Sequence, residues 1–154
     1  MYRKGISALI INGKKEFLLV NLISFEEKYF SIPGGGVEAN ETLEEAAYRE
    51  IKEELGINTS SLEKIGLSKN PLSFTFKVPK VNSEGKEYIG SERHFFAFRF
   101  IGFDSEIHLT ENEVHAYKWV PFSELGTYLL FDNQLSDTTE KIKEILGDLI
   151  ENCR

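Results

Sequence analysis

The sequence is poor in the features that mark secreted and membrane proteins. It has a single cysteine, Cys153, so no internal disulfide can form, and this suits a reducing compartment. No stretch approaches the roughly 20 apolar residues of a membrane-spanning helix. The first residues also lack the apolar run and small-residue cleavage site of a secretory signal. These absences predict a cytoplasmic protein without a membrane partner.

A surplus of positive charge is also missing, because 25 acidic residues outnumber 18 basic ones and leave a formal net charge of −7. This balance argues against broad electrostatic binding of nucleic acid, although it is compatible with a local basic patch. The 154 residues, 41% of them hydrophobic, suit one globular domain with its own core. Since no repeat or linker interrupts the chain, we predict a single domain over residues 1–154. The oligomeric state is left open.

Glycines and glutamates are concentrated in residues 33–57, which read PGGGVEANETLEEAAYREIKEELGI. Thr42 followed by Glu45 has the spacing of a helix capping box, and Gly56 suits the position just past a last helical turn. The pattern predicts a helix over residues 43–55, with Asn40 as an alternative N-cap. The glycine run that precedes this helix allows the backbone to approach a ligand closely.

The predicted helix carries three carboxylates along one edge. At about 100° per residue, Glu50 and Glu54 fall on nearly the same line, and Glu53 lies about 60° to one side. A hard divalent cation would relieve the repulsion between these groups, since oxygen ligands suit Mg²⁺ and Mn²⁺. The alternative is a solvated acidic face on which Arg49 is an ordinary partner of its neighbours. The glycine run favours a metal and polyphosphate site over this alternative.

Alternating apolar residues predict a sheet around this helix. The expected strands cover residues 2–12, 17–22, 29–32, 65–68, 72–78, 91–101 and 116–120, with a turn at Asn12-Gly13. A short helix is expected over residues 122–125, after Pro121. An amphipathic helix is expected from Ser136 onward. This order of elements indicates an α/β protein with a mixed sheet between helices.

Residues 35–57 resemble the Nudix box, which reads G, five residues, E, seven residues, then R-E-U-x-E-E-x-G-U, where U is a bulky aliphatic residue. All nine fixed positions are matched, by Gly35, Glu41, Arg49, Glu50, Ile51, Glu53, Glu54, Gly56 and Ile57. The resemblance implies a Nudix-type α/β/α sandwich with a mixed β-sheet. It also implies a hydrolase that cleaves a pyrophosphate bond in a nucleoside diphosphate linked to another group, with Mg²⁺, or alternatively Mn²⁺, as cofactor.

Metal ligands follow from the same resemblance. A fourth carboxylate is expected on a later loop, where Glu113, six residues before Trp119, is favoured over Glu111. A backbone carbonyl of Gly35 or Gly36 is expected to complete the coordination. The implied metal set is Glu50, Glu53, Glu54, Glu113 and Gly35.

The resemblance also assigns catalytic roles. A metal-bound water is expected to attack phosphorus in line. Glu53 is the favoured proton acceptor, and Glu50 is the next candidate. Arg49 is expected to hold the carboxylates in place, while Glu41 orders the loop.

Substrate contacts are predicted at Arg3, Phe30 and Gly36. The opening Tyr2-Arg3 resembles the start of the Nudix subgroup that cleaves dinucleoside polyphosphates and RNA 5′ triphosphate ends, so Arg3 is a candidate phosphate ligand, the alternative being a charge at a frayed terminus. The chain departs from the bacterial RNA-end enzymes at Gly34, where they usually have Gln, and at Lys4, where they have Pro. Phe30 either lines a base pocket or belongs to the core, and the core is favoured.

The expected partner is a nucleotide-type small molecule such as a dinucleoside polyphosphate, or a 5′-polyphosphorylated RNA end. One alternative is a nucleoside triphosphate pyrophosphohydrolase of the housecleaning type. Another is a non-catalytic Nudix-fold binding module, which would be expected to have lost box carboxylates that this chain keeps. A Nudix-like isomerase of isoprenoid diphosphates would require a reactive cysteine inside the fold, where Cys153 is badly placed.

Overall fold

A computed structural model describes residues 1–150 of the chain, so Cys153 lies outside the described residues. Its centre is a seven-stranded mixed sheet. Five of the strands follow the order β4-β6-β1-β2-β7, and the other two pair beside this path, β3 with β1 and β5 with β6. The strands are β1 (Tyr2–Ile11), β2 (Glu16–Leu22), β3 (Gly34–Gly36), β4 (Leu62–Leu67), β5 (Leu72–Val81), β6 (Glu87–Phe100) and β7 (Val114–Pro121).

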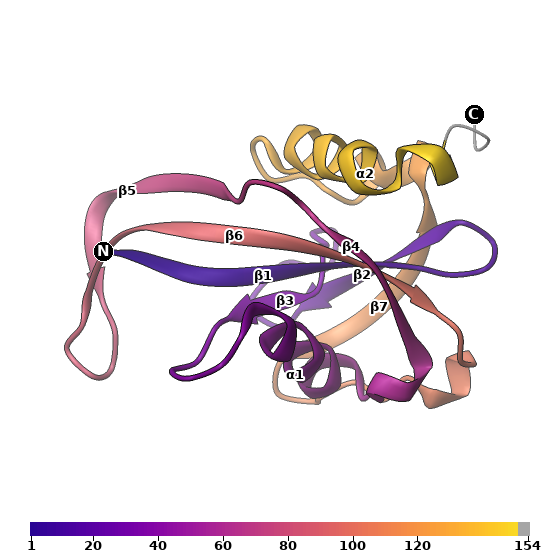
Figure 1. Cartoon of the computed structure of the whole chain (residues 1–154), viewed down its shortest axis with the longest axis horizontal. Helices are drawn as coiled ribbons and strands as arrows, with labels where there is room; N and C mark the ends of the chain where they lie inside the picture. Colours follow the sequence, from indigo (N-terminus) through magenta and orange to yellow (C-terminus); the bar gives the residue numbers. More distant parts are fainter. Residues whose placement is uncertain (151–154) are drawn as a thin grey trace.

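Two helices, α1 (Leu43–Leu55) and α2 (Gln134–Ile150), cover opposite faces of this sheet (Figure 1). Strand β1 lies between them and is buried on both faces. Its Ile6 and Ile10 pack in the core beneath α1, while Leu9 and Ile11 pack in the core beneath α2. The α/β/α sandwich expected from the sequence is therefore confirmed.

Helix α1 begins and ends where the sequence predicted. The Thr42 hydroxyl accepts a hydrogen bond from the Glu45 backbone N–H at 3.1 Å, and the Glu45 carboxylate accepts one from the Thr42 N–H at 3.0 Å. Gly56 ends the helix with a φ of 70°, in the left-handed region that glycine tolerates best. Asn40 is not the N-cap.

Several element boundaries differ from the sequence-based prediction. The expected strand at residues 29–32 forms only one isolated bridge, between Val20 and Ser31. Strands β5 and β6 form a longer hairpin than expected, because pairing resumes after the irregular residues 76–79, where Lys80 and Val81 pair with Tyr88 and Glu87. Helix α2 begins at Gln134, two residues before Ser136. Short 3₁₀ helices cover Thr59–Ser61, Asp104–Glu106 and Phe122–Thr127.

Within residues 1–150, no helix has both the length and the apolar composition needed to cross a membrane.

Candidate active site

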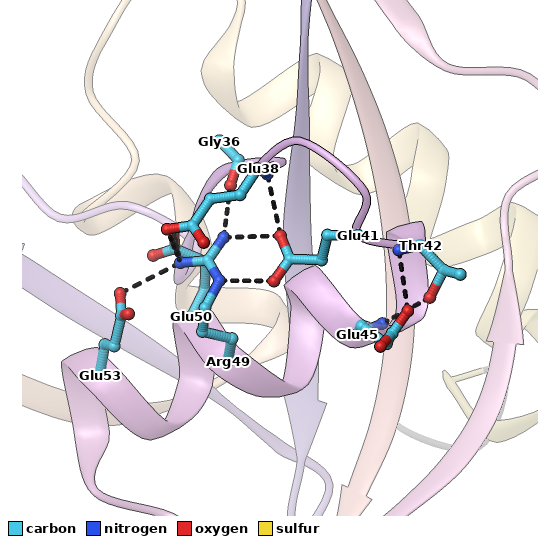
Figure 2. A network of polar contacts seen from close by, with 8 residues as sticks. All are labelled: Gly36, Glu38, Glu41, Thr42, Glu45, Arg49, Glu50 and Glu53. Carbon is cyan, nitrogen blue, oxygen red and sulfur yellow. Dashed lines mark hydrogen bonds and ion pairs between the residues drawn. The ribbon is translucent and has the colours of Figure 1, made fainter.

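The Arg49 side chain organises the loop between β3 and α1 (Figure 2). Its Nε and Nη2 donate to the two carboxylate oxygens of Glu41 at 2.6 and 2.9 Å. Nη2 also donates to the carbonyl oxygen of Gly36 at 2.7 Å. The hydrogen bonds between the two opposite charges lower the pKa of Glu41 and raise that of Arg49.

Arg49 also reaches the catalytic candidates on its own helix. Its Nη1 donates to Glu50 at 2.9 Å and to Glu53 at 3.2 Å, as Figure 2 shows. The relative solvent exposure of the side chain is 48% for Glu53 and 13% for Glu50. Arg49 therefore holds one half-buried and one solvent-facing carboxylate beside the loop.

Glu50 lies directly against the glycine loop. A Cβ atom at Gly35 would collide with the Glu50 carboxylate, so only glycine allows this approach. Burial raises the pKa of Glu50 above its ordinary value, while the hydrogen bond and charge of Arg49 oppose that rise. The glycine and the carboxylate are thus packed as one unit.

Glu54 is the most buried carboxylate of this group, with a relative exposure of 5%. Its Oε1 accepts a 3.4 Å hydrogen bond from the Gly34 N–H, and its Oε2 is buried without a hydrogen-bond partner among the described residues. Burial, together with the charges of Glu50 and Glu113, raises the pKa of Glu54 to about 8. An orphaned carboxylate oxygen among other carboxylates is an arrangement that a cation would stabilise.

Glu113 approaches these residues from the loop before β7. Its carbonyl oxygen accepts from the Ile23 N–H at 2.9 Å, and its own N–H donates to the Thr110 carbonyl at 3.0 Å. Thr110 in turn donates its backbone N–H to the Glu54 carbonyl at 3.3 Å and its hydroxyl to the Glu53 carbonyl. These bonds tie the loop to the end of α1, close enough for the charge of Glu113 to raise the pKa of both Glu50 and Glu54.

The predicted metal set is thus gathered in one region, but it does not form a closed cage. Among residues 1–150, no three carboxylate, imidazole or thiolate groups converge closely enough to enclose an ion. Glu50 and Glu53 are instead directed to Arg49. The donor set consists of oxygens and includes the orphaned Oε2 of Glu54, so it fits a hard divalent cation.

A cationic cavity of about 270 Å³ adjoins this acidic cluster, lined in part by Gly35, Gly36, Arg3 and Arg93. A Cβ built on Gly36 would lie 2.7 Å from Nη2 of Arg3, so the Arg3 guanidinium lies against the glycine backbone. Arg93 is largely buried and donates from Nη1 to the Ile6 carbonyl at 3.0 Å and to the Ser7 hydroxyl at 3.1 Å.

Sequence reasoning missed Arg93. Burial and the nearby charge of Arg3 lower its pKa, while Glu54 and Glu50 oppose that decrease. The sequence did offer one signal for Arg93. Alternate residues of a strand face the same side, and Phe95 and Ala97, which share that side of β6 with Arg93, are buried. A charged residue at such an inward-facing position is unusual. Two adjacent guanidinium groups facing one cavity form a site suited to phosphate oxygens.

Two of the predicted substrate-binding residues, Phe30 and Gly36, make contacts within the protein itself. Phe30 has a relative exposure of 4% and packs edge-on against Tyr128 in the core beneath α2, with ring centroids 5.4 Å apart. Phe30 therefore lies in the core, which is the favoured alternative. The Gly36 carbonyl already accepts a hydrogen bond from Arg49. What Gly36 contributes to the predicted substrate site is a backbone without a side chain, against which the Arg3 guanidinium lies.

A family model described as the NUDIX domain matches residues 1–142. The RNA pyrophosphohydrolase of Pelagibacter ubique (strain HTCC1062) is 32% identical over 157 aligned positions, which cover 94% of each chain. The RNA pyrophosphohydrolase of Orientia tsutsugamushi (strain Boryong) is 30% identical over 132 positions, which cover 80% of this chain and 78% of the relative. The chain therefore belongs to the Nudix family.

Solved structures agree at the level of the fold. A C. elegans Ap4A hydrolase in a binary complex superimposes with a TM-score of 0.68 at 20% identity, covering 94% of this chain and 98% of the other. The E. coli dihydroneopterin triphosphate pyrophosphohydrolase gives a TM-score of 0.69 at 20% identity, with 91% and 96% coverage.

Family membership also defines the class of reaction. The protein is an enzyme that hydrolyses pyrophosphate bonds in nucleotide-linked substrates. Nudix hydrolases generally need a divalent metal ion, which agrees with the oxygen-only donor set.

Proposed function

We propose that this enzyme acts on the 5′-polyphosphorylated end of RNA and uses Mg²⁺. The observation that carries the proposed site is the buried, unpartnered Oε2 of Glu54. The other oxygen of this carboxylate accepts from Gly34, and the adjacent Gly35 lines a cavity together with Arg3 and Arg93. A cation near Glu54 would give its unpartnered oxygen a partner, and a polyphosphate would neutralise the two arginines, which form no ion pair within residues 1–150. The two RNA pyrophosphohydrolase relatives support RNA as the substrate.

In this proposal the metal ligands are Glu50, Glu53, Glu54 and Glu113, with the Gly35 carbonyl as a further donor. Bound Mg²⁺ would neutralise the polyphosphate and lower the pKa of a coordinated water. Glu53 accepts the proton of the attacking water, because it is the most exposed carboxylate held by Arg49 on its own helix. Glu50 is the second candidate for this role.

Arg3 and Arg93 bind the phosphate oxygens. They cannot act as bases at neutral pH, so their contribution is to orient the chain of phosphates for in-line attack. Water adds to phosphorus as the bond to the leaving phosphate oxygen breaks, which leaves a shortened 5′ end. We further propose that residues 1–154 act as one domain in the cytoplasm.

The proposal is tested by incubating the purified protein and Mg²⁺ with triphosphorylated RNA, a dinucleoside tetraphosphate, nucleoside triphosphates and a nucleotide sugar. We expect the RNA to be the preferred substrate and its product to carry a 5′ monophosphate. If only the dinucleoside tetraphosphate is cleaved, dinucleoside polyphosphates would replace RNA as the proposed substrate. No product from any substrate would contradict hydrolase activity itself.

Individual roles need separate variants. Glu53→Gln should abolish most turnover while the fold stays intact, and near wild-type turnover would remove Glu53 as the base. Glu113→Gln should weaken the binding of Mg²⁺ or Mn²⁺, measured by titration. Unchanged metal affinity would favour Glu111, the other carboxylate of that loop.

A further inference from the structure

Strands β5 and β6 extend beyond both helices as a two-stranded hairpin, on the left of Figure 1. We call residues 74–89 the β5–β6 ribbon. Within the described residues, β5 pairs with β6 alone. Its register shifts between Thr75 and Lys80, so residues 76–79 bulge from the ladder. Large apolar side chains are exposed here, with relative exposures of 60% for Phe74 and 72% for Val78.

The ribbon combines these apolar groups with lysines that have no acidic partner, and Arg3 of β1 lines the same cavity as Phe76 and Lys80. Among the ion pairs formed within residues 1–150, none includes Arg3, Lys77 or Lys80. The Lys80 ammonium lies 4.6 Å from the centre of the Phe76 ring. Uncompensated cations beside aromatic rings stand out in a chain with a net charge of −7.

The ribbon is continuous with the active site. The cavity of about 270 Å³ beside the glycine loop is lined by Arg3 and Phe76. The same two side chains line a second cavity of about 420 Å³, which reaches Lys80, Asn82 and Tyr88 near the end of the ribbon. A chain-like ligand can therefore pass from the glycine loop along the ribbon without leaving a hollowed surface.

We propose that the β5–β6 ribbon binds the single-stranded RNA that follows the reacting 5′ end, an inference that rests on the proposed function. Bases stack on Phe76 and Tyr88, and the backbone phosphates contact Arg3, Lys77 and Lys80. Aromatic faces accept any base, and lysines neutralise phosphates without reading sequence. The ribbon thus supplies affinity for the RNA body, independent of its sequence.

RNA length provides the test. Two triphosphorylated substrates share the same first two nucleotides, one ending there and the other continuing to about ten nucleotides. The double variant Lys77→Glu/Lys80→Glu should lose about tenfold in kcat/KM on the long RNA and little on the short one. The matched control Lys14→Glu/Lys143→Glu changes the net charge equally at two exposed lysines outside the ribbon. It should affect neither substrate.

Salt gives a second readout. For the wild type, the dependence of log kcat/KM on log salt should be steeper with the long RNA than with the short one. The double variant should reduce that slope by about 0.7 for each phosphate that a lysine no longer neutralises. Equal loss on both lengths, or no loss on either, would overturn the binding of RNA along the ribbon.

Two further results would also overturn this proposal. If gel filtration shows a dimer that the double variant dissociates, the ribbon binds a second copy of the chain instead of RNA. If the wild type cleaves dinucleoside tetraphosphate but neither RNA, the proposed function fails and RNA binding by the ribbon fails with it. By contrast, the absence of loss on either RNA overturns the role of the ribbon and leaves the proposed function intact.

Discussion

Each of the two helices buries one charged side chain, Glu54 on α1 and Lys141 on α2, and both have a relative exposure of 5%. The Lys141 ammonium donates to the Asn70 carbonyl at 2.6 Å and to the Glu144 carboxylate at 3.3 Å. Glu54 accepts one long bond from Gly34, and its second oxygen has no partner within residues 1–150. A buried charge with its partners in place is part of the fold, whereas an unpartnered one implies a ligand.

The largest expected effect is on catalysis by Glu54→Gln, which keeps the shape of the side chain and removes its charge. We expect kcat to fall by at least about 100-fold, because a metal ligand is lost. The melting temperature of the metal-free protein should stay the same or rise, because glutamine is neutral without taking up a proton, whereas Glu54 must be protonated to be buried without a partner. Steady-state kinetics and calorimetry in chelator measure the two effects. Lower stability with normal turnover would make Glu54 a structural residue like Lys141.

Arg49→Lys is expected to have the next largest effect, lowering kcat by about 10- to 100-fold. Lysine cannot form the bidentate pair with Glu41 while also reaching Glu50, so the carboxylates lose their fixed positions. Lys52→Arg on the same helix is the matched control and should be neutral. Kinetics at saturating Mg²⁺ and a metal titration separate positioning from affinity. Normal metal affinity and turnover in Arg49→Lys would contradict the proposed role of Arg49.

The pH dependence of stability comes third. The pKa of Glu54 is raised to about 8 in the folded protein, so between pH 5 and 7 the folded state binds more protons than the unfolded state. Stability in chelator should therefore fall as pH rises, by about 2 kcal/mol across this window. Denaturant unfolding of the wild type and Glu54→Gln at both pH values measures the difference. If the unfolding free energy changes equally with pH in the two proteins, Glu54 is not the titrating group.

Lys141→Met is expected to have the smallest effect, and it acts on stability alone. The Asn70 carbonyl and the Glu144 carboxylate would lose a donor, which should cost about 1 to 2 kcal/mol of unfolding free energy. The exposed Lys143→Met is the control and should be near neutral. Turnover should be unchanged in both variants. A large loss of activity in Lys141→Met would show that the buried lysine also serves the active site.

Local sequence signals predicted α1 and its cap correctly, because Thr42, Glu45 and Gly56 make bonds within a few residues of one another. The line of Glu50 and Glu54 along the helix followed from helix geometry in the same way. Residues 29–32 were predicted as a strand from their aromatic content, but they form a single bridge. Strand formation depends on a pairing partner, which local propensity does not supply.

Contacts between distant segments were the part that sequence patterns left open. Arg93 reaches the active site only because β6 lies parallel to β1 and pairs Arg93 with Gly5. Phe30 has the same apolar character in a core as in a base pocket, and its neighbours Tyr128 and Gln134 come from about a hundred residues away. No periodicity within either segment contains that information.

The sequence by itself determined the class of chemistry, since the spacing of glycine, arginine and glutamates within residues 35–57 predicts a metal and polyphosphate site through local geometry alone. Only the tertiary structure decided which of these charged groups are buried and which other charges lie near them. Packing against β3 buries Glu54 and half-buries Glu50, and the loop before β7 adds the charge of Glu113. Sheet order also places Arg3, Arg93 and the β5–β6 ribbon beside them. Burial and long-range proximity depend on which strands pair, and pairing is a property of the whole chain.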